Sequence, residues 1–233
     1  MKTKPRFNAL EHLQHTLQST DFHPVIPANY SPDNVVVLDL SKHNTALQQV
    51  NLANTEAFSD YIFNEVLRGK LGVGGYAENR YVYTRSPHYA GAEPRSVHLG
   101  IDIWVPAHTP VHAPLDGLVY GFADNQGFGN YGPTIILQHQ LNNITFFTLY
   151  GHLSRRNLRG LEKKQWVREG EVIGDVGNYP ENGDWPPHLH FQVMNAMLGN
   201  ISDFPGVAAP SDRQRYLSVC PDPNFILAIP SLF

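Results

Sequence analysis

Three short stretches of the sequence hold histidine and aspartate side chains that could bind a metal ion together. HLGIDIW contains His98 and Asp102, PPHLHF contains His188 and His190, and TFFTLYGH ends on His152. Imidazole and carboxylate ligands that leave one coordination position open are typical of catalytic rather than structural zinc. The sequence therefore predicts a zinc centre at which water is activated for hydrolysis.

A second set of residues has similar spacing, so spacing alone is weak evidence. The chain has 12 histidines in 233 residues, and a random order would already give roughly 0.6 His-x-His pairs. The rival set is His108, His112 and Asp116, which lies among prolines that exclude the helix needed to bring residues four apart together. We therefore expect these three residues in turns or at the surface.

The alternation in HLGIDIW is typical of a strand, and it places His98 and Asp102 on one face. Four residues of straight strand span about 13 Å, too far for both side chains to reach one ion. We therefore predict a bend near Gly100, where glycine tolerates the departure. His188 and His190 face the same way about 6.6 Å apart along their strand. One can bind the metal while the other stands beside it.

The elements that must position these residues are mainly β-strands. From about residue 80 onward, short apolar runs alternate with turn residues, which favours a mainly β fold built as an antiparallel sheet or sandwich. The predicted strands are 80–84, 98–104, 117–122, 134–139, 145–150, 172–176 and 189–194.

The first part of the chain has a different pattern and predicts an added N-terminal α/β lobe. Phe7, Leu10, Leu13 and Leu17 recur at helical spacing. A strand is predicted at 35–38 and a second amphipathic helix at 58–67, and we interpret the glycine cluster at 71–76 as a linker or turn. These patterns predict a lobe at 1–76, a β domain at 77–200 and a C-terminal extension at 201–233 that packs on it.

Composition and charge exclude several classes of function. The net charge is −4, and no run of lysine or arginine supports a nucleic-acid or anionic-membrane partner. No window is apolar enough for a membrane span. The first twenty residues lack the features of a signal peptide, which predicts a cytoplasmic protein. Cys220 is the single cysteine, which excludes an intramolecular disulfide, and we interpret it as part of the core.

Four ordered stretches resemble the motifs of the lysostaphin/LytM-type zinc metallopeptidases, a duplicated-hybrid-motif family. They are HLGIDIWVPAHTPVHAPLDGLV, YGHLS, GEVIGDVGN and PHLHF, spread over residues 97–194. The resemblance implies zinc ligands at His98, Asp102 and His190, and non-ligand active-site histidines at His152 and His188. It also implies a largely antiparallel β fold with a shallow groove, and cleavage of peptide bonds in bacterial cell-wall cross-bridges, often beside glycine.

The sequence departs from the family pattern around the expected groove. Gln192 replaces a frequent acidic residue, Ala107 and Pro186 stand where glycine is common, and the segment 178–187 is longer than usual. These departures bear on substrate choice more than on metal binding, and Trp185 is close enough to PPHLH to line a substrate wall. Three further stretches of sequence also resemble cytoplasmic family domains that are fused to aminotransferases. They are LDGLVYGF, NYGPTIILQH and NGDWPPHLHFQV.

The function these features predict is zinc-dependent hydrolysis of a peptide or amide bond, in a cell-wall-type or glycine-containing peptide. His152 or His188 takes a proton from water and the other assists the oxyanion or the leaving amine, with the assignment left open. Two alternatives stay open: a zinc-retaining binding module, and a cytoplasmic hydrolase of a small non-peptide amide. A latent form, with Asn79, His88 or Glu93 filling the open zinc position, is a further hypothesis. The sequence predicts no oligomeric state.

Overall fold

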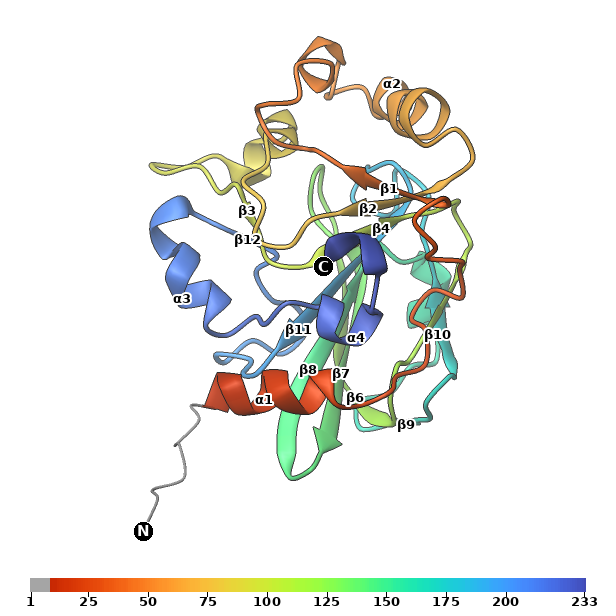
Figure 1. Ribbon diagram of the computed structural model, residues 1–233, viewed down its shortest axis with the longest axis vertical. Coiled ribbons are helices and arrows are strands. Elements are labelled where there is room, and N and C mark those ends of the chain that lie inside the picture. The colour runs from red at the N-terminus through yellow and green to blue at the C-terminus, as the bar shows by residue number, and fades with distance from the viewer. Residues whose placement is uncertain (1–8) are drawn as a thin grey trace.

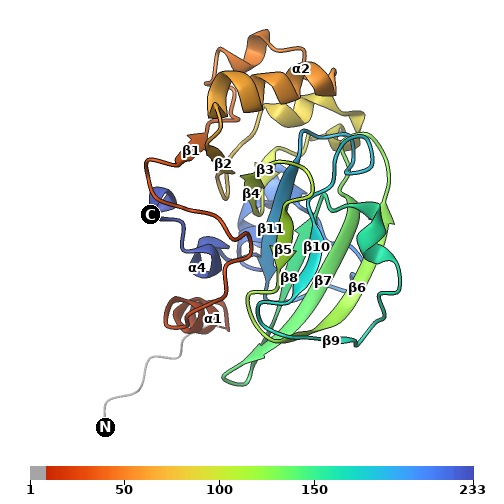
Figure 2. The ribbon, with the colours of Figure 1, turned by 90° about the vertical axis from the view of Figure 1, so that its right-hand side faces the viewer.

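A large mixed β-sheet runs through the structure, a computed structural model that describes residues 9–233. β1 and β2 pair in parallel, and every other neighbouring pair in this sheet is antiparallel. Figure 2 shows the long strands β11, β8, β7 and β6 side by side. In spatial order the strands are β1 (Val35–Leu38), β2 (Leu71–Gly74), β4 (Ile101–Trp104), β11 (His188–Met194), β8 (Ile144–Gly151), β7 (Gly132–Leu141), β6 (Gly117–Asn125) and β9 (Trp166–Val167).

Two small sheets cover the two faces of the large one. β5 (Pro110–His112) pairs with β10 (Val172–Asp175), and Val111 of β5 lies in one core cluster with Ile135 of β7. β3 (Val97–His98) pairs with β12 (Val207–Ala208), and this pair shares a second cluster with Ile136. Ile135 and Ile136 are neighbours in one strand and therefore face opposite sides. The layered, mainly β class is confirmed, although the sheet is mixed rather than wholly antiparallel.

The alternation of side chains along β11 decides which face carries the chemistry. Leu189, Phe191 and Val193 are fully buried in the core that also contains Leu13 and Leu17 of helix α1 (Ala9–Gln18). Burial of each large apolar side chain contributes about 1.5–3 kcal/mol relative to exposure. Because side chains alternate along a strand, the histidines at 188 and 190 are forced onto the opposite face.

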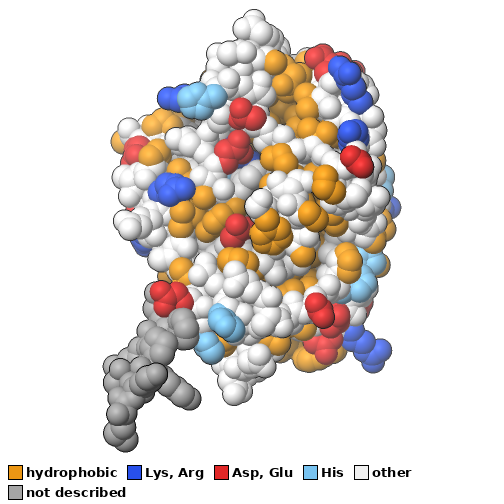
Figure 3. All heavy atoms as spheres, in the orientation of Figure 1, with side chains coloured by type: hydrophobic (Ala, Val, Ile, Leu, Met, Phe, Trp, Pro, Cys, Tyr) orange, Lys and Arg blue, Asp and Glu red, His pale blue; other side chains and the backbone are white. Residues whose placement is uncertain are grey.

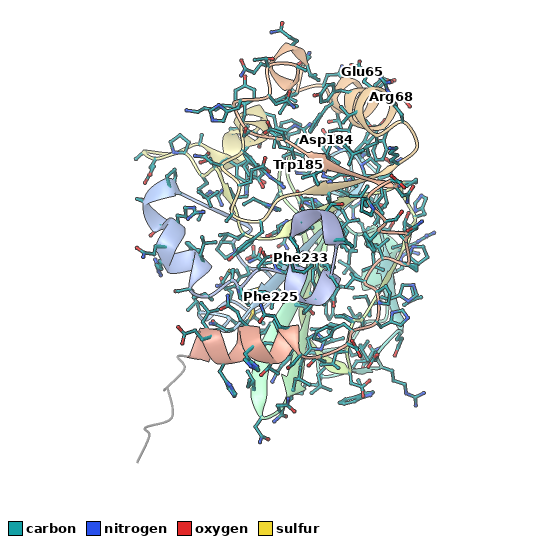
Figure 4. All side chains as sticks on the ribbon, viewed as in Figure 1. Glu65, Arg68, Asp184, Trp185, Phe225 and Phe233 are labelled. Carbon is teal, nitrogen blue, oxygen red and sulfur yellow. The ribbon has the colours of Figure 1, made fainter. Side chains whose placement is uncertain are left out.

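The helices lie around the edges and ends of the sheet. α1 contacts α4 (Asn224–Leu227) at one end, and α2 (Thr55–Asp60) continues into a π-helix (Tyr61–Leu67) above β1 and β2 at the other (Figure 1). Figure 4 shows Asp184 and Trp185 beneath the π-helix that carries Glu65 and ends just before Arg68. The remaining helical segments are α3 (Arg213–Leu217) and 3-10 turns at Leu47–Gln49, Val82–Arg85, Pro87–Tyr89, Arg155–Leu158, Pro210–Asp212 and Pro230–Leu232.

Two of the predicted elements are wrong. Residues 80–84 do not form a strand, because the chain turns into a 3-10 helix at Val82–Arg85 and the side chain of Arg80 is buried. The glycine cluster at 71–76 is not a linker, because Leu71–Gly74 form β2 between β1 and β4. Glycine is required there, since a Cβ at Gly72 would lie 3.0 Å from the Cβ of Trp104.

Most of the other predicted strands are confirmed, with slightly longer bounds. The predicted bend is confirmed too, because β3 ends at His98, a bend lies at Gly100, and β4 begins at Ile101 in a different sheet. Phe7, which was expected on the face of the first helix, lies outside the described residues. Cys220 is fully buried in an apolar cluster, as predicted.

Charge and hydropathy add little that is specific. On the face shown in Figure 3, the lysine and arginine side chains drawn are scattered rather than gathered into one basic surface. Among residues 9–233, no helix combines the length and the apolar character needed to cross a membrane.

Candidate metal centre and active-site cavity

Three electron-rich side-chain atoms converge at one point on the histidine face of the sheet. The Nε2 atom of His98 lies 2.9 Å from Nδ1 of His190 and 3.2 Å from Oδ1 of Asp102. The third side of the triangle, from Nδ1 of His190 to Oδ1 of Asp102, measures 3.0 Å. Ligand atoms around tetrahedral zinc lie about 3.3 Å apart when each bond is about 2.0 Å. The three side chains therefore have the spacing and the donor types of a zinc site.

Strand register explains how distant stretches of sequence meet there. In the antiparallel pair β4–β11, His190 lies directly opposite Asp102. The bend at Gly100 carries His98 into the neighbouring small sheet and back over the same point. A Cβ at Gly100 would lie 2.6 Å from the carbonyl oxygen of Phe191 and 2.7 Å from the ring of His190. Only glycine lets the two segments approach so closely.

Hydrogen bonds on the far side of each ring fix where the imidazole protons lie. Nδ1 of His98 lies 3.0 Å from the carbonyl oxygen of Gly75, which can only accept, so this nitrogen carries the proton. Nε2 of His190 lies 2.9 Å from Oε1 of Gln192. The amide nitrogen of Gln192 donates to the carbonyl of Pro205, which assigns Oε1 as the acceptor. The two ring nitrogens that face each other across the site, Nε2 of His98 and Nδ1 of His190, therefore carry no proton, and each has a free lone pair.

A buried arginine supports the carboxylate of this cluster. Arg80 Nη1 donates to Oδ2 of Asp102, the oxygen that does not face the histidines, and its Nε donates to Glu78 at 2.8 Å. Burial alone would raise the pKa of Asp102, but the positive charge of Arg80 holds this pKa well below its usual range. Burial lowers the pKa of His98 to about 3. Ionised Asp102 beside neutral His98 is the protonation state that a divalent metal requires.

Two further histidines face the same space without joining the cluster. Nδ1 of His152 donates to the carbonyl of Asn182 at 2.7 Å, and Nδ1 of His188 donates to the carbonyl of Pro186 at 2.7 Å. Each ring therefore carries its proton on the nitrogen that faces away from the other histidines, and Nε2 is a bare acceptor. The centroids of the two rings lie 4.2 Å apart.

The surroundings keep both of these imidazoles unprotonated at neutral pH. Burial lowers the pKa of His152 well below its usual value and lowers the pKa of His188 to about 4. His152 follows β8 with a backbone φ of +62°, a left-handed conformation that is uncommon for residues other than glycine. His188 stacks on Trp104, with ring centroids 4.3 Å apart. Both rings are thus held in one orientation.

The two histidines line one cavity of about 180 Å³ together with Asp102 and His190 of the cluster. Trp185 lines this cavity, as its closeness to PPHLH suggested. Tyr131, which no sequence pattern singled out, also lines it, and its hydroxyl oxygen lies 3.3 Å from Nε2 of His190. That nitrogen already donates its proton to Gln192 and cannot accept one, so the hydroxyl proton of Tyr131 is free for another group. Burial raises the pKa of Tyr131 well above its usual value, so the hydroxyl stays protonated.

The rival histidines lie away from the cluster, but only His108 is at the surface as predicted, because His112 is a half-buried residue of strand β5. The side chain of His108 is 57% exposed and pairs with Asp175 at 3.0 Å, while His112 donates to the carbonyl of Gly170. Of the residues considered for a latent form, His88 lines the cavity, and Glu93 accepts a hydrogen bond from the backbone of Ser211. None of the latent-form residues is part of the metal-ligand cluster found among the described residues.

A metal-ligand cluster that shares a cavity with two unprotonated imidazoles is the arrangement of a metallohydrolase, and comparison with known proteins agrees with that class. Residues 96–201 match the family model described as Peptidase family M23. The matched residues include every histidine of the site.

Three relatives illustrate the similarity. The DD-carboxypeptidase/endopeptidase Mpg of Neisseria meningitidis is 34% identical over 126 residues, which are 52% of this chain and 26% of the relative. The peptidoglycan DD-endopeptidase ShyC of Vibrio cholerae is 34% identical over 97 residues, covering 42% of this chain and 20% of that protein. The glycyl-glycine endopeptidase ALE-1 of Staphylococcus capitis is 31% identical over 103 residues, which are 44% of this chain and 26% of that protein. The matched region therefore spans about a quarter of the length of these relatives.

Proposed function

We propose that this chain is a zinc-dependent peptidase that hydrolyses a peptide bond in a peptidoglycan-type or glycine-containing peptide. The observation that carries the proposal is the triangle of three bare acceptor atoms on His98, Asp102 and His190. Acceptors at 2.9–3.2 Å with no proton between them repel one another. A bound cation removes that repulsion, and two imidazoles and a carboxylate suit zinc.

The metal and the chain would divide the chemistry. When bound, zinc supplies Lewis-acid polarisation of a carbonyl and lowers the pKa of water toward neutrality. His98, Asp102 and His190 would hold it, and Arg80 would keep the carboxylate of Asp102 ionised and oriented. The matched peptidase family supports the choice of an amide bond as substrate.

The remaining histidines would move the proton. Their bare Nε2 atoms can each accept a proton from attacking water, because the outward nitrogen already carries one. The imidazolium formed at His152 or His188 would then donate that proton to the leaving amine. The free hydroxyl proton of Tyr131 would hydrogen-bond the oxyanion that develops during attack.

The names of the relatives suggest which bonds to test. Mpg and ShyC are named for DD-peptidase activity and ALE-1 for cleavage between glycines. A panel should therefore contain a peptide ending in D-Ala-D-Ala, a DD-cross-linked muropeptide and a pentaglycine peptide. Chelator-sensitive cleavage of any member supports the proposal. Failure of the fully zinc-loaded protein to cut every member would contradict it and would favour a zinc-retaining binding module.

Two variants separate metal binding from turnover. His190→Ala should lose stoichiometric zinc, measured by elemental analysis of protein purified without added metal. His152→Ala should keep zinc and lose turnover. His112→Ala, outside the cavity, is the control that should change neither. An unchanged kcat in His152→Ala would show that this histidine is not the proton carrier.

The size of the cavity favours one second candidate, a small amide rather than a polymer. A volume of about 180 Å³ is smaller than the ~300–1,000 Å³ typical of drug-sized ligand sites. A panel of small amides assayed beside the peptides tests this candidate, and exclusive cleavage of the small amides would establish it.

A further inference from the structure

The wall of the cavity has two parts of different origin. The metal-ligand cluster and the histidines at 152 and 188 lie within residues 96–201, the part that matches the peptidase family. A second part of the wall comes from two segments outside the match, 80–95 and 203–207. Whatever those segments recognise is therefore a property of this chain that the family match does not assign.

Arg95 is one of two arginines in that second wall, and neighbouring groups hold its side chain in place. Its guanidinium lies over the ring of Tyr89, with the central carbon 5.2 Å from the ring centroid, and Nη2 donates to the carbonyl of His88. The hydroxyl of Tyr89 donates to the carbonyl of Gly129 at 2.6 Å, and Tyr89 packs on Tyr83 with centroids 4.5 Å apart. Because the ring beneath it is fixed, the guanidinium loses little entropy on meeting a ligand.

The charge of Arg95 is not neutralised by contact with an acid. Arg80, the other arginine that lines the cavity beside the metal cluster, pairs with both Asp102 and Glu78. Within residues 9–233, no carboxylate lies at ion-pair distance from Arg95. Asp203 lines the same wall but forms no ion pair with it. A planar guanidinium with unused N–H donors is the group that best matches a carboxylate.

We propose that Arg95 binds a free carboxylate of the substrate while the scissile bond lies at the metal cluster. That the bound peptide is a substrate rests on the proposed function, whereas the binding of a carboxylate-bearing peptide does not. The carboxylate is either the C-terminus of the peptide or an acidic side chain, since both offer the same two oxygens. In either case Arg95 selects peptides that carry this charge over peptides in which it is amidated.

The test measures binding separately from cleavage. Three probes are titrated by calorimetry into the zinc-loaded His152→Ala chain, which should keep zinc without turnover: a D-Ala-D-Ala-terminated peptide, its C-terminal amide, and that amide with one internal alanine changed to glutamate. We expect the amide to bind roughly tenfold to a hundredfold more weakly than the free acid, the range of a charged hydrogen bond. Tight binding of the glutamate probe instead would identify a side-chain carboxylate as the ligand.

Variants assign the effect to Arg95. Arg95→Gln should abolish the preference for the acid over the amide, and Arg95→Lys should keep part of it as a point charge. Asp203→Asn should strengthen binding of the acid about twofold or more, because it removes a repelling charge from the same wall. The matched control is Arg215→Gln, since Arg215 also lies over a tyrosine ring, 5.6 Å from the centroid of Tyr216, but outside the cavity.

The two proposals fail in different ways. Equal binding of acid and amide, a preference that survives in Arg95→Gln, or no binding of any carboxylate probe would overturn the role of Arg95. Cleavage with no carboxylate preference would leave the peptidase proposal standing alone. A carboxylate preference that depends on Arg95, without any cleavage, would support the binding site and contradict the peptidase.

Discussion

The hydroxyl of Tyr131 combines a free proton with a position beside the metal-ligand cluster. Replacement by phenylalanine keeps the ring and removes only the donor. We expect Tyr131→Phe to lower kcat about a hundredfold, as loss of one oxyanion donor does in other hydrolases. Steady-state kinetics with a zinc assay on the same sample checks this. A normal kcat at full zinc content would exclude the donor role.

Gln192 fixes the proton of His190 through a hydrogen bond of 2.9 Å. Gln192→Ala removes that acceptor, so the ring loses its fixed tautomer and orientation. We expect zinc affinity to fall roughly tenfold to a hundredfold, measured by competition with a coloured chelator. The matched control is Gln140→Ala on the exposed side of β7, which should bind zinc normally. Equal affinities in the two variants would contradict the role of Gln192.

At the scale of residues, a site side chain can be predicted from the sequence where it belongs to a local motif. His98, Asp102 and His190 were named from motifs, and the structure brings their ligand atoms together. Arg80, Tyr131 and Arg95 were not named, because their relevance depends on contacts between segments distant in the sequence. Gln192 was noticed only as a departure from a pattern. Its hydrogen bond to His190 is visible only in the structure.

The bend between β3 and β4 depends on the missing side chain of Gly100. Gly100→Ala places a Cβ 2.6 Å from the carbonyl oxygen of Phe191. Neither strand backbone can move easily to relieve this contact. We expect a loss of about 1–3 kcal/mol in unfolding free energy, together with loss of stoichiometric zinc. Gly75→Ala is the control, because a Cβ there lies no closer than 3.8 Å to any neighbour. Denaturant unfolding and elemental analysis distinguish them.

β7 contains a buried histidine away from the site, and it predicts a pH dependence of stability. Burial lowers the pKa of His139 to about 4, and its Nε2 lies 2.7 Å from the hydroxyl of Thr148. The unfolded chain, with a pKa near 6.5, binds the proton first as pH falls. This contribution is therefore present above about pH 6.5 and is lost as pH falls toward 4, by ~3 kcal/mol at most.

The measurement compares unfolding free energies of the wild type and His139→Gln between pH 4 and 7. Other buried histidines contribute to the wild-type slope, so only the difference between the two proteins is assigned to His139. The variant should show a shallower fall in stability. Identical slopes would mean that protonation of His139 does not oppose folding.

At the scale of elements, patterns of side chains predicted the strands that have one clear inner face. β7 and β8 were found because their apolar residues face the core between turn residues. β2 was missed because its glycines lack the side chains that carry an alternating pattern, although they permit close packing on Trp104. Residues 80–84 were misassigned because their apolar side chains are buried by 3-10 turns rather than by a strand.

The metal-ligand cluster joins β3, β4 and β11, which belong to two different sheets. Removal of zinc should therefore lower the stability of the whole folded molecule. Loaded at a hundred times its Kd, a ligand stabilises the folded state by about 2.7 kcal/mol. For a chain of this size that corresponds to a fall of roughly 5–10 °C in Tm on chelation.

Thermal unfolding with and without chelator checks this, with recovery expected when zinc is returned. His190→Ala should be insensitive to chelator. A wild-type Tm unchanged by chelation at verified metal loss would contradict a metal that links the two sheets.

At the scale of the whole molecule, the pairing of distant segments could not be predicted. β2 pairs with β4, and β12 pairs with β3, so segments from both ends of the chain complete the sheets around the site. Such pairings depend on register and contacts that no local pattern encodes. The division of the chain at residues 76 and 200 stays a prediction, as does the cytoplasmic location.

The two parts of the cavity wall come from different segments of the chain, so peptide selectivity can change separately from the metal-ligand cluster. Segments 80–95 and 203–207 contribute contacts without supplying any of the three metal-ligand side chains. Exchanging the parts of these segments other than Arg80, which holds Asp102, and Pro205, which orients Gln192, should change which peptides bind while the reaction stays the same. The natural diversification of this chain would then proceed by loop replacement around an inherited core.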